Sequence, residues 1–132
     1  MFDHIKFGVR DFARSRTFYL KALEPIGVTV VTDWPPDGAE LSHPGGMSSL
    51  CLYQTEEKPA HLHIAFVAQR RDQVDAFYHA ALDAGGKDNG PPGIRPQYSE
   101  RYYAAFVLDP DGHNIEVVCH EDELEEVENI DR

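Results

Sequence analysis

The sequence predicts an α+β protein made of two similar halves, in which each half has the order strand, helix and three further strands. Three observations predict this fold class: an internal repeat, a period-two alternation of apolar residues at the start of each copy, and helical spacing of apolar residues directly afterwards. The repeat aligns HIKFGVRDFARSRTFYLKAL, residues 4–23, with HIAFVAQRRDQVDAFYHAAL, residues 63–82, without a gap. One supersecondary unit is therefore used twice.

In the first half, the alternation over residues 4–9 predicts a strand, and Asp11 is the predicted N-cap of the helix that follows. Pro25 and Gly27 are expected to end this helix. Three short strands, VTVVTDW, AELSH and SSLCLYQ, are then separated by the turn sequences PPDG and PGG.

In the second half, residues 62–68 alternate in the same way, and a helix is expected from about Asp72 to the glycine pair at 85–86. The segment GGKDNGPPGIRP, residues 85–96, is expected to be a loop, because prolines and glycines dominate it. The strands RYYAAFVL and HNIEVVCH then form a hairpin around DPDG. We expect one domain over residues 1–120, with modules at about 1–56 and 60–120, and an acidic tail over 121–132.

Composition and charge exclude several classes of partner. The chain has 132 residues, which suits one domain with a hydrophobic core, and it contains no run of about 18 apolar residues that would span a membrane. The net charge of −11 disfavours nucleic acid and anionic membrane surfaces. The two cysteines form no CxxC motif and the N-terminus has no signal-peptide pattern, so we expect a cytoplasmic protein.

Each copy of the repeat begins with a histidine, His4 or His63, on the strand face opposite the predicted helix. If the two halves associate by pseudo-symmetry, both imidazoles face a shared concave surface. His61 lies on the same face as His63 but lacks the repeat register with His4, so His63 is the preferred metal ligand.

The last hairpin supplies a carboxylate to the same surface. A type I turn at DPDG with Gly112 in the left-handed conformation places Phe106 opposite Glu116, whereas pairing without this bulge would place Ala105 there. Together with the two histidines, Glu116 would form a facial triad on a divalent ion, and imidazole with carboxylate admits Fe, Mn, Ni, Co or Zn.

Further side chains are expected around this surface. Arg95 and Arg101 flank the long loop of the second half, where they either meet an anionic substrate group or are solvated. Tyr98 and Tyr102 either line the mouth of the cavity or pack. The expected cavity lining is Cys51, Arg95, Arg101, Tyr102 and Phe106, and the catalytic candidates are Tyr102 and His120.

Three separated motifs, HIKFGVRDFARSRTFYLKAL, HIAF and FVLDPDGHNIEVV, resemble the vicinal oxygen chelate superfamily over nearly the whole chain to about His120. This superfamily includes glyoxalase I, extradiol dioxygenases, fosfomycin-resistance thiol transferases and bleomycin-binding proteins. The resemblance implies two βαβββ modules whose eight strands form a curved mixed sheet around a cavity, with the helices on the outer face. It also implies His4, His63 and Glu116 as metal ligands, and a homodimer.

The sequence departs from two members of this superfamily. Glyoxalase I has a further carboxylate ligand where this chain has Cys51 and a glycine where it has Glu24, so lactoylglutathione lyase activity is not expected. Extradiol dioxygenases have a tyrosine where this chain has Phe106. Because phenylalanine cannot donate a hydrogen bond, this difference weakens the dioxygenase interpretation.

Three hypotheses on function follow from these observations. The first is a divalent-metal-dependent glyoxalase-like enzyme, of lyase or isomerase type, that acts on a small substrate chelating through vicinal oxygens. The others are an extradiol-type dioxygenase and a metal-free, drug-sequestering binding protein. The cavity is formed either within one chain or across a dimer.

Overall fold

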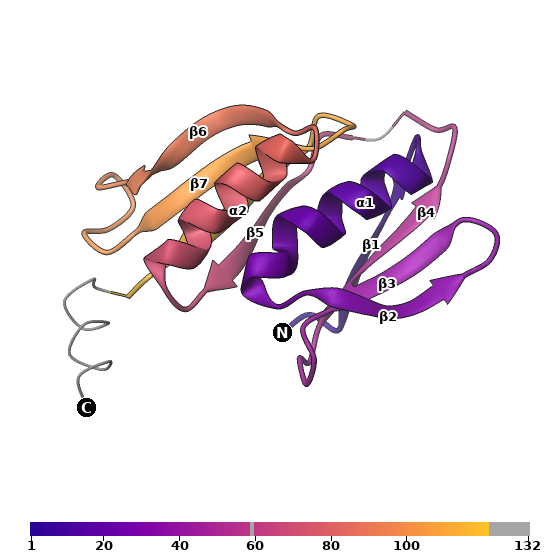
Figure 1. The fold of residues 1–132 in the computed structure, drawn as a ribbon, viewed down its shortest axis with the longest axis horizontal. Coiled ribbons are helices and arrows are strands. Elements are labelled where there is room, and N and C mark those ends of the chain that lie inside the picture. Colours follow the sequence, from indigo (N-terminus) through magenta and orange to yellow (C-terminus); the bar gives the residue numbers. More distant parts are fainter. Residues whose placement is uncertain (59, 122–132) are drawn as a thin grey trace.

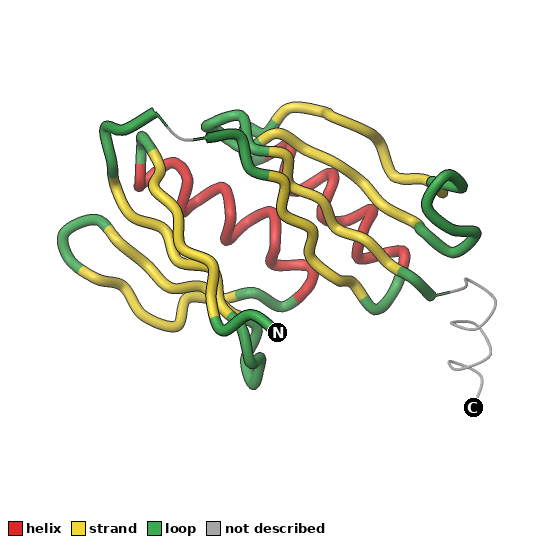
Figure 2. Tube along the Cα trace, turned by 180° about the vertical axis from the view of Figure 1, so that it is seen from behind, coloured by secondary structure: helices red, strands yellow, loops and turns green. Residues whose placement is uncertain are grey.

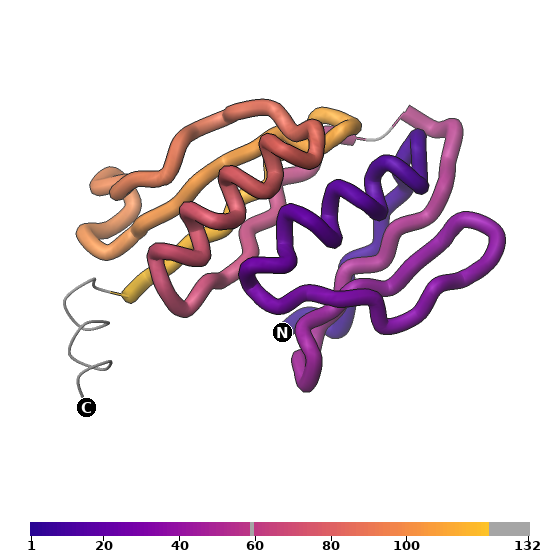
Figure 3. The backbone as a smooth tube through the Cα atoms, in the orientation of Figure 1, coloured from indigo at the N-terminus to yellow at the C-terminus, as the bar shows by residue number. Residues whose placement is uncertain are grey.

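The computed structural model describes residues 1–58 and 60–121, which form two modules that follow each other along the chain (Figure 1, Figure 3). Module one contains β1 (His4–Val9), α1 (Phe12–Leu23), the short helix η1 (Glu24–Ile26), β2 (Thr29–Trp34), β3 (Gly38–Ser42) and β4 (Ser49–Gln54). Module two contains β5 (His63–Ala68), α2 (Arg71–Asp83), β6 (Lys87–Ile94), β7 (Tyr103–Leu108) and β8 (Asn114–Cys119). From residue 122 on, the predicted tail lies outside the described residues.

Each module forms its own four-stranded sheet, with strand orders β1-β4-β3-β2 and β5-β8-β7-β6. In both sheets the first strand pairs in parallel with the last, and the other neighbours are antiparallel. The matching topology confirms the predicted α+β fold of two βαβββ modules. The eight strands are divided between two hydrogen-bonded sheets, because β1 and β5 each pair with only one neighbour and form edges.

The two helices lie side by side on one side of the molecule, and each covers the sheet of its own module (Figure 1). Seen from behind, the two sheets turn their other faces outward (Figure 2). The core lies between helices and sheets, and its largest fully buried members include Phe18, Tyr19, Leu41, Phe77 and Ile115. No helix of the described segments is long and apolar enough to cross a membrane.

The predicted ends of α1 are confirmed. The Asp11 side chain accepts a hydrogen bond from the backbone N–H of Arg14, which satisfies one of the free donors in the first turn. After η1, Gly27 has a φ of 87°, a left-handed conformation that closes the helical segment and that a glycine adopts without strain.

The loop predicted over residues 85–96 is wrong for residues 87–94, which form β6. This strand pairs with β7 on one side only, from Lys87 opposite Leu108 to Ile94 opposite Tyr103. Its ladder shifts register between Gly90 and Gly93, so the prolines at 91 and 92 fall in an irregular stretch where no backbone donor is required. An edge strand tolerates these residues, and composition alone therefore misplaced the loop.

The turn between β7 and β8 joins the two modules. The Tyr19 hydroxyl of α1 donates a hydrogen bond to one carboxylate oxygen of Asp109, and the other oxygen accepts the N–H groups of Asp111 (2.9 Å) and His113 (2.8 Å). His113 is fully buried, and its Nδ1 accepts the N–H of Leu62 at 3.0 Å. Both carboxylate oxygens of Asp109 therefore accept hydrogen bonds from other groups of the protein.

Candidate functional site

Glu116 is a buried carboxylate in the middle of β8 that is held by two side chains. Its Oε1 lies 2.7 Å from Nε2 of His63 on β5, and its Oε2 accepts a hydrogen bond from the hydroxyl of Tyr102, which directly precedes β7. Glu116 is 1% exposed, whereas the His63 side chain is 55% exposed. The carboxylate is therefore shielded, while its imidazole partner is open to a ligand.

The hairpin register that brings these groups together agrees with the sequence prediction. Gly112 has a φ of 87°, and Phe106 lies directly opposite Glu116 in the antiparallel ladder. Ala105 lies opposite Val117, and both are fully buried. Phe106, and not Ala105, therefore shares the outward face of the sheet with Glu116.

Tyr102 is a hydrogen-bond donor at neutral pH. Burial, the hydrogen bond to Glu116 and the negative charge of Glu116 raise the pKa of Tyr102 to about 12. The phenol therefore keeps its proton and cannot serve as a general base near pH 7. Its ring also contacts the rings of Tyr98 and His120, at centroid distances of 4.9 and 5.3 Å.

The two buried carboxylates among residues 1–58 and 60–121 differ in their surroundings. Asp109 accepts hydrogen bonds from backbone amides, which cannot move away without unfolding the turn. Glu116 has only side-chain partners, His63 and Tyr102, and both can rotate. Glu116 is thus the buried acid whose partners can be exchanged for a ligand.

His4 occupies the position in module one that His63 occupies in module two. His4 lies opposite Ser49 in the parallel ladder of its sheet, as His63 lies opposite Asn114, and Cys51 corresponds in the same way to Glu116. Nδ1 of His4 hydrogen-bonds the Asp3 carboxylate at 2.7 Å, which leaves Nε2 of this exposed ring as the outward atom.

The structure brings His63 and Glu116 together but does not place His4 beside them. Within residues 1–58 and 60–121, no group of three His, Cys, Asp or Glu side chains is positioned to hold a metal ion. The pair nevertheless fits a divalent ion chemically, because imidazole nitrogen and carboxylate oxygen are common ligands of the first-row metals. His61, two residues before His63, instead lines a separate pocket with Arg10, Arg14 and Lys58 among others.

The outward face of module one carries aromatic rings that sequence reasoning missed. Nζ of Lys6 lies 5.8 Å from the ring centre of Trp34 and 5.4 Å from that of Tyr53. Lys6 is on β1 and Trp34 on β2, at opposite edges of the sheet, so the sheet curves around this face. Lys6 is two residues after His4 on the same strand, and this spacing alone could have placed Lys6 on the same face as His4. Cys51 lies on the same sheet and is buried.

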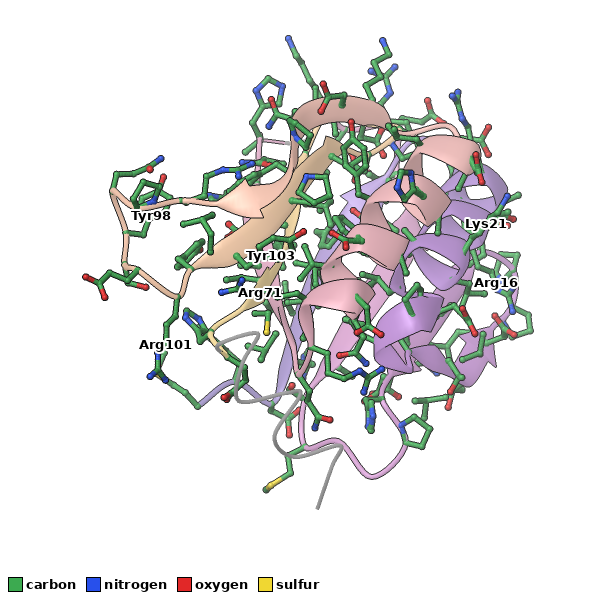
Figure 4. The ribbon with its side chains drawn as sticks, turned by 60° about the vertical axis from the view of Figure 1, so that its left-hand side comes forward. Arg16, Lys21, Arg71, Tyr98, Arg101 and Tyr103 are labelled. Carbon is green, nitrogen blue, oxygen red and sulfur yellow. The ribbon has the colours of Figure 1, made fainter. Side chains whose placement is uncertain are left out.

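The loop between β6 and β7 carries the remaining predicted residues. Arg95 follows β6 directly, and its guanidinium lies 5.2 Å from the centre of the Phe106 ring, next to Glu116. Figure 4 shows Tyr98 and Arg101 at the end of the molecule that is remote from Arg16 and Lys21 of α1. The contact of Arg95 with Phe106 places its guanidinium over the face that bears Glu116.

Comparison with known proteins assigns the family. The family model described as Glyoxalase/Bleomycin resistance protein/Dioxygenase superfamily matches residues 1–117. No protein of curated function matches the sequence. A glyoxalase/bleomycin resistance protein from Albidiferax ferrireducens is 28% identical, with a TM-score of 0.74 over 90% of this chain and 98% of that one.

Two further solved structures share the fold at lower identity. A glyoxalase/bleomycin resistance protein/dioxygenase family enzyme from Burkholderia phytofirmans is 17% identical, with a TM-score of 0.72 over 90% of this chain and 98% of that one. A lactoylglutathione lyase from Agrobacterium tumefaciens is 16% identical, with a TM-score of 0.67 over 90% of this chain and 92% of that one. The predicted resemblance is thereby confirmed, and the chain belongs to the glyoxalase/bleomycin resistance protein/dioxygenase superfamily.

Proposed function

We propose that the chain is a divalent-metal-dependent, glyoxalase-like enzyme of lyase or isomerase type that acts on a small substrate chelating through vicinal oxygens. The observation that carries this proposal is the buried Glu116 carboxylate with His63 at 2.7 Å on an open sheet face. Membership of a superfamily that includes such enzymes supports it. Both cysteines are free and buried, which supports a cytoplasmic location.

His63, Glu116 and His4 are the proposed metal ligands. The contact between Asp3 and Nδ1 of His4 supports this role, because a carboxylate on one ring nitrogen fixes the tautomer that presents the other to a metal. When bound, a divalent ion supplies Lewis-acid chemistry that polarises the vicinal oxygens of a substrate. Two imidazoles and one carboxylate are compatible with Fe, Mn, Ni, Co and Zn alike.

The neighbouring side chains have separate roles in this proposal. Tyr102 donates to Glu116 and fixes the orientation of the carboxylate. His120 contacts the Tyr102 ring and is the candidate base, because an imidazole accepts a proton near neutral pH whereas the phenol of Tyr102 holds its own. Phe106 presents an apolar surface beside the carboxylate.

We infer that two copies of the chain complete the site. His4 and Glu116 lie on different sheets. β1 and β5 are edge strands, each hydrogen-bonded on one side, and another chain can approach the other side. A largely apolar cavity of about 340 Å³ lies between β1 and β5. Ile5 lines it on the β1 side, and Ile64, Phe66 and Val67 line it on the β5 side. Val67 is 70% exposed, so a partner at this edge would remove apolar surface from water.

Metal binding by a matched pair of variants tests the proposed ligands. His63→Ala is expected to lose the metal that the wild-type chain binds, whereas His61→Ala is expected to keep it, because His61 lies in another pocket. Both are measured by elemental analysis after dialysis against each candidate ion. Full metal content in His63→Ala would contradict the assignment.

Mixed dimers test whether the site is shared between two copies. A dimer of one His4→Ala chain and one His63→Ala chain would retain a single site, formed by the intact His4 of one copy and the intact His63 of the other. Co-expression of differently tagged chains is therefore expected to restore about half of the wild-type metal content, a fraction that follows from this count of sites. Purified mixed dimers without metal would place all the ligands in one chain.

A second candidate function is metal-free binding of a small molecule. It is favoured by the exposed rings of Trp34, Tyr53 and Tyr98, which stand on or near the open faces. In that case a ligand would bind equally well to the wild-type chain and to His63→Ala in the presence of a chelator.

A further inference from the structure

The guanidinium of Arg95 is held in a fixed position by uncharged groups. Its Nη1 donates to the carbonyl oxygen of Gly93 at 2.9 Å and its Nη2 to that of Pro91 at 2.7 Å. One side lies against the Phe106 ring, at 5.2 Å from the ring centre. The planar group is therefore ordered before any ligand arrives, which reduces the entropy that a ligand must overcome.

Two glycines make room for this arrangement. A Cβ atom at Gly93 would lie 3.2 Å from Nη1 of Arg95, and one at Gly90 would lie 3.2 Å from Nη2 and 3.0 Å from the Phe106 ring. All three contacts are tighter than ordinary van der Waals packing. The glycines in the irregular stretch of β6 therefore leave the space that the guanidinium occupies.

Arg95 has no carboxylate partner among the described residues, although the chain contains 23 acidic and only 12 basic residues. Other arginines are paired: Arg16 with Asp33 at 2.9 Å and Arg70 with Asp72 at 3.0 Å. A guanidinium has five N–H donors, and two of those of Arg95 are occupied by carbonyl groups that do not neutralise its charge.

The position of Arg95 connects it to the proposed metal ligands. The Phe106 ring that it covers also contacts the His63 ring, at a centroid distance of 6.2 Å, and lies opposite Glu116 in the ladder. A single aromatic ring therefore separates the guanidinium from the His63–Glu116 pair. A molecule bound at that pair would reach Arg95 by extending over Phe106.

We propose that Arg95 is the receptor for an anionic group, a carboxylate or a phosphate, which the substrate carries a few bonds away from its vicinal oxygens. The inference rests on the proposed function and specifies its substrate class as anionic vicinal-oxygen compounds. Arginine suits this role because its donors match two oxygens of a carboxylate or phosphate at once.

Matched pairs of probes test this specificity. Catechol and 3,4-dihydroxybenzoate share vicinal oxygens and differ by one carboxylate, whereas glycerol and glycerol 3-phosphate differ by one phosphate. Affinities of the wild-type chain and its variants are measured by isothermal titration calorimetry. The side-chain Nε–H NMR signal of Arg95, assigned by its loss in Arg95→Gln, reports contact with the anion in the wild-type chain. We expect at least one anionic probe to shift this signal and to bind the wild-type chain on the order of tenfold or more tighter than its neutral counterpart. The pair that shows the preference identifies the anion.

Three variants separate recognition by Arg95 from general charge effects. Arg95→Gln is expected to abolish the preference, and Arg95→Lys to retain part of it, because lysine keeps the charge and loses the planar fork. Lys87→Gln removes one charge from the other end of β6 and is expected to keep the full preference. The result for Arg95→Lys decides the matter if Arg95→Gln does not fold. An equal loss in Lys87→Gln and Arg95→Gln would overturn the proposal.

The same titrations with EDTA and with Zn(II), a diamagnetic ion that leaves the NMR signal observable, distinguish this inference from the proposed function. A preference that depends on Arg95 and persists in EDTA supports the anion receptor even if the chain binds no metal. Metal-dependent binding of charged and neutral probes with equal affinity, unchanged in Arg95→Gln, would support the metal site and overturn the receptor. The absence of any shift at Arg95 with both anionic probes at millimolar concentration would also overturn it.

Discussion

The hydroxyl of Tyr19 in α1 donates a hydrogen bond to the carboxylate of Asp109 in the turn between β7 and β8. Both residues are buried, and they belong to different modules. Burial, together with the negative charge of Asp109, raises the pKa of Tyr19 well above its usual value, so this donor keeps its proton under all ordinary conditions. The bond therefore fixes the first helix to the turn that sets the register of Glu116.

Tyr19→Phe is expected to destabilise the chain by about 1–3 kcal/mol, because a buried carboxylate oxygen of Asp109 loses its partner. Urea unfolding followed by circular dichroism measures the change. Tyr98→Phe is the control. Tyr98 is 63% exposed, so loss of its hydroxyl should lower the free energy of unfolding by less than about 0.5 kcal/mol. Equal losses in the two variants would show that the Tyr19 bond contributes nothing specific.

Gly86→Ala is expected to destabilise the chain by about 1–3 kcal/mol through overpacking. A Cβ atom there would lie 2.5 Å from a methyl carbon of Val107 and 2.8 Å from the Phe18 ring, and both neighbours are fully buried and unable to withdraw. Thermal unfolding compares this variant with Lys87→Ala, a change at the adjacent exposed position. An unchanged midpoint for Gly86→Ala would mean that Val107 of β7 and Phe18 of α1 can move to admit the extra methyl group.

Tyr102 is expected to ionise near pH 12, above the pKa of about 10 of a free tyrosine side chain. Burial is the largest cause and the contact with Glu116 the next, so Glu116→Gln should lower the pKa of Tyr102 only part of the way toward 10. Tyrosinate absorbance is recorded as a difference titration against Tyr102→Phe. Ionisation of Tyr102 near pH 10, the value of a free phenol, would contradict the hydrogen bond to Glu116.

The same shift predicts how stability depends on alkaline pH. The pKa of Tyr102 is about 12 in the folded chain and about 10 in the unfolded one. Its contribution is therefore fully present below pH 10 and is lost as the pH rises to 12, because the unfolded chain releases this proton first. Tyr102→Phe should lose less stability than the wild-type chain between pH 10 and 12, as measured by urea unfolding at several pH values.

Iron-loaded wild-type protein is expected to show negligible ring cleavage of simple catechols. Phe106 lies beside Glu116 and cannot donate a hydrogen bond to a reacting oxygen, and loss of such a donor commonly costs about a hundredfold or more in rate. Oxygen consumption with Fe(II) and catechol measures the activity. Turnover at roughly 1 per second or faster, an ordinary enzymatic rate, would show that this use of Phe106 is wrong.

Much of the fold could be predicted because short-range patterns determine it. The N-cap at Asp11, the end of α1 near Gly27 and the register of Phe106 opposite Glu116 all depend on residues a few positions apart. The strand at 87–94 could not be predicted from the same rules. Its prolines and glycines disfavour a strand locally, and only the pairing with β7 compensates for this.

The candidate site was predictable in part for a related reason. Strand periodicity shows which face His63 and Glu116 share, and β5 and β8 pair directly, so the two meet. His4 has the same period but belongs to the other sheet, and no pattern within a module specifies how two sheets are placed relative to each other. The bond between Tyr102 and Glu116 joins the residue before β7 to a residue on β8, and it likewise required the structure.

Trp34 is the one tryptophan of the chain, and it lies over the face of module one beside Lys6. The intrinsic fluorescence of the protein is therefore a local reporter, dominated by a single half-exposed indole next to a cation. A ligand that stacks on this face would quench or shift the emission, whereas one that contacts only module two would leave the emission spectrum unchanged. In an assembly where the outward faces of two copies meet, the same indole would report the arrival of the neighbouring chain.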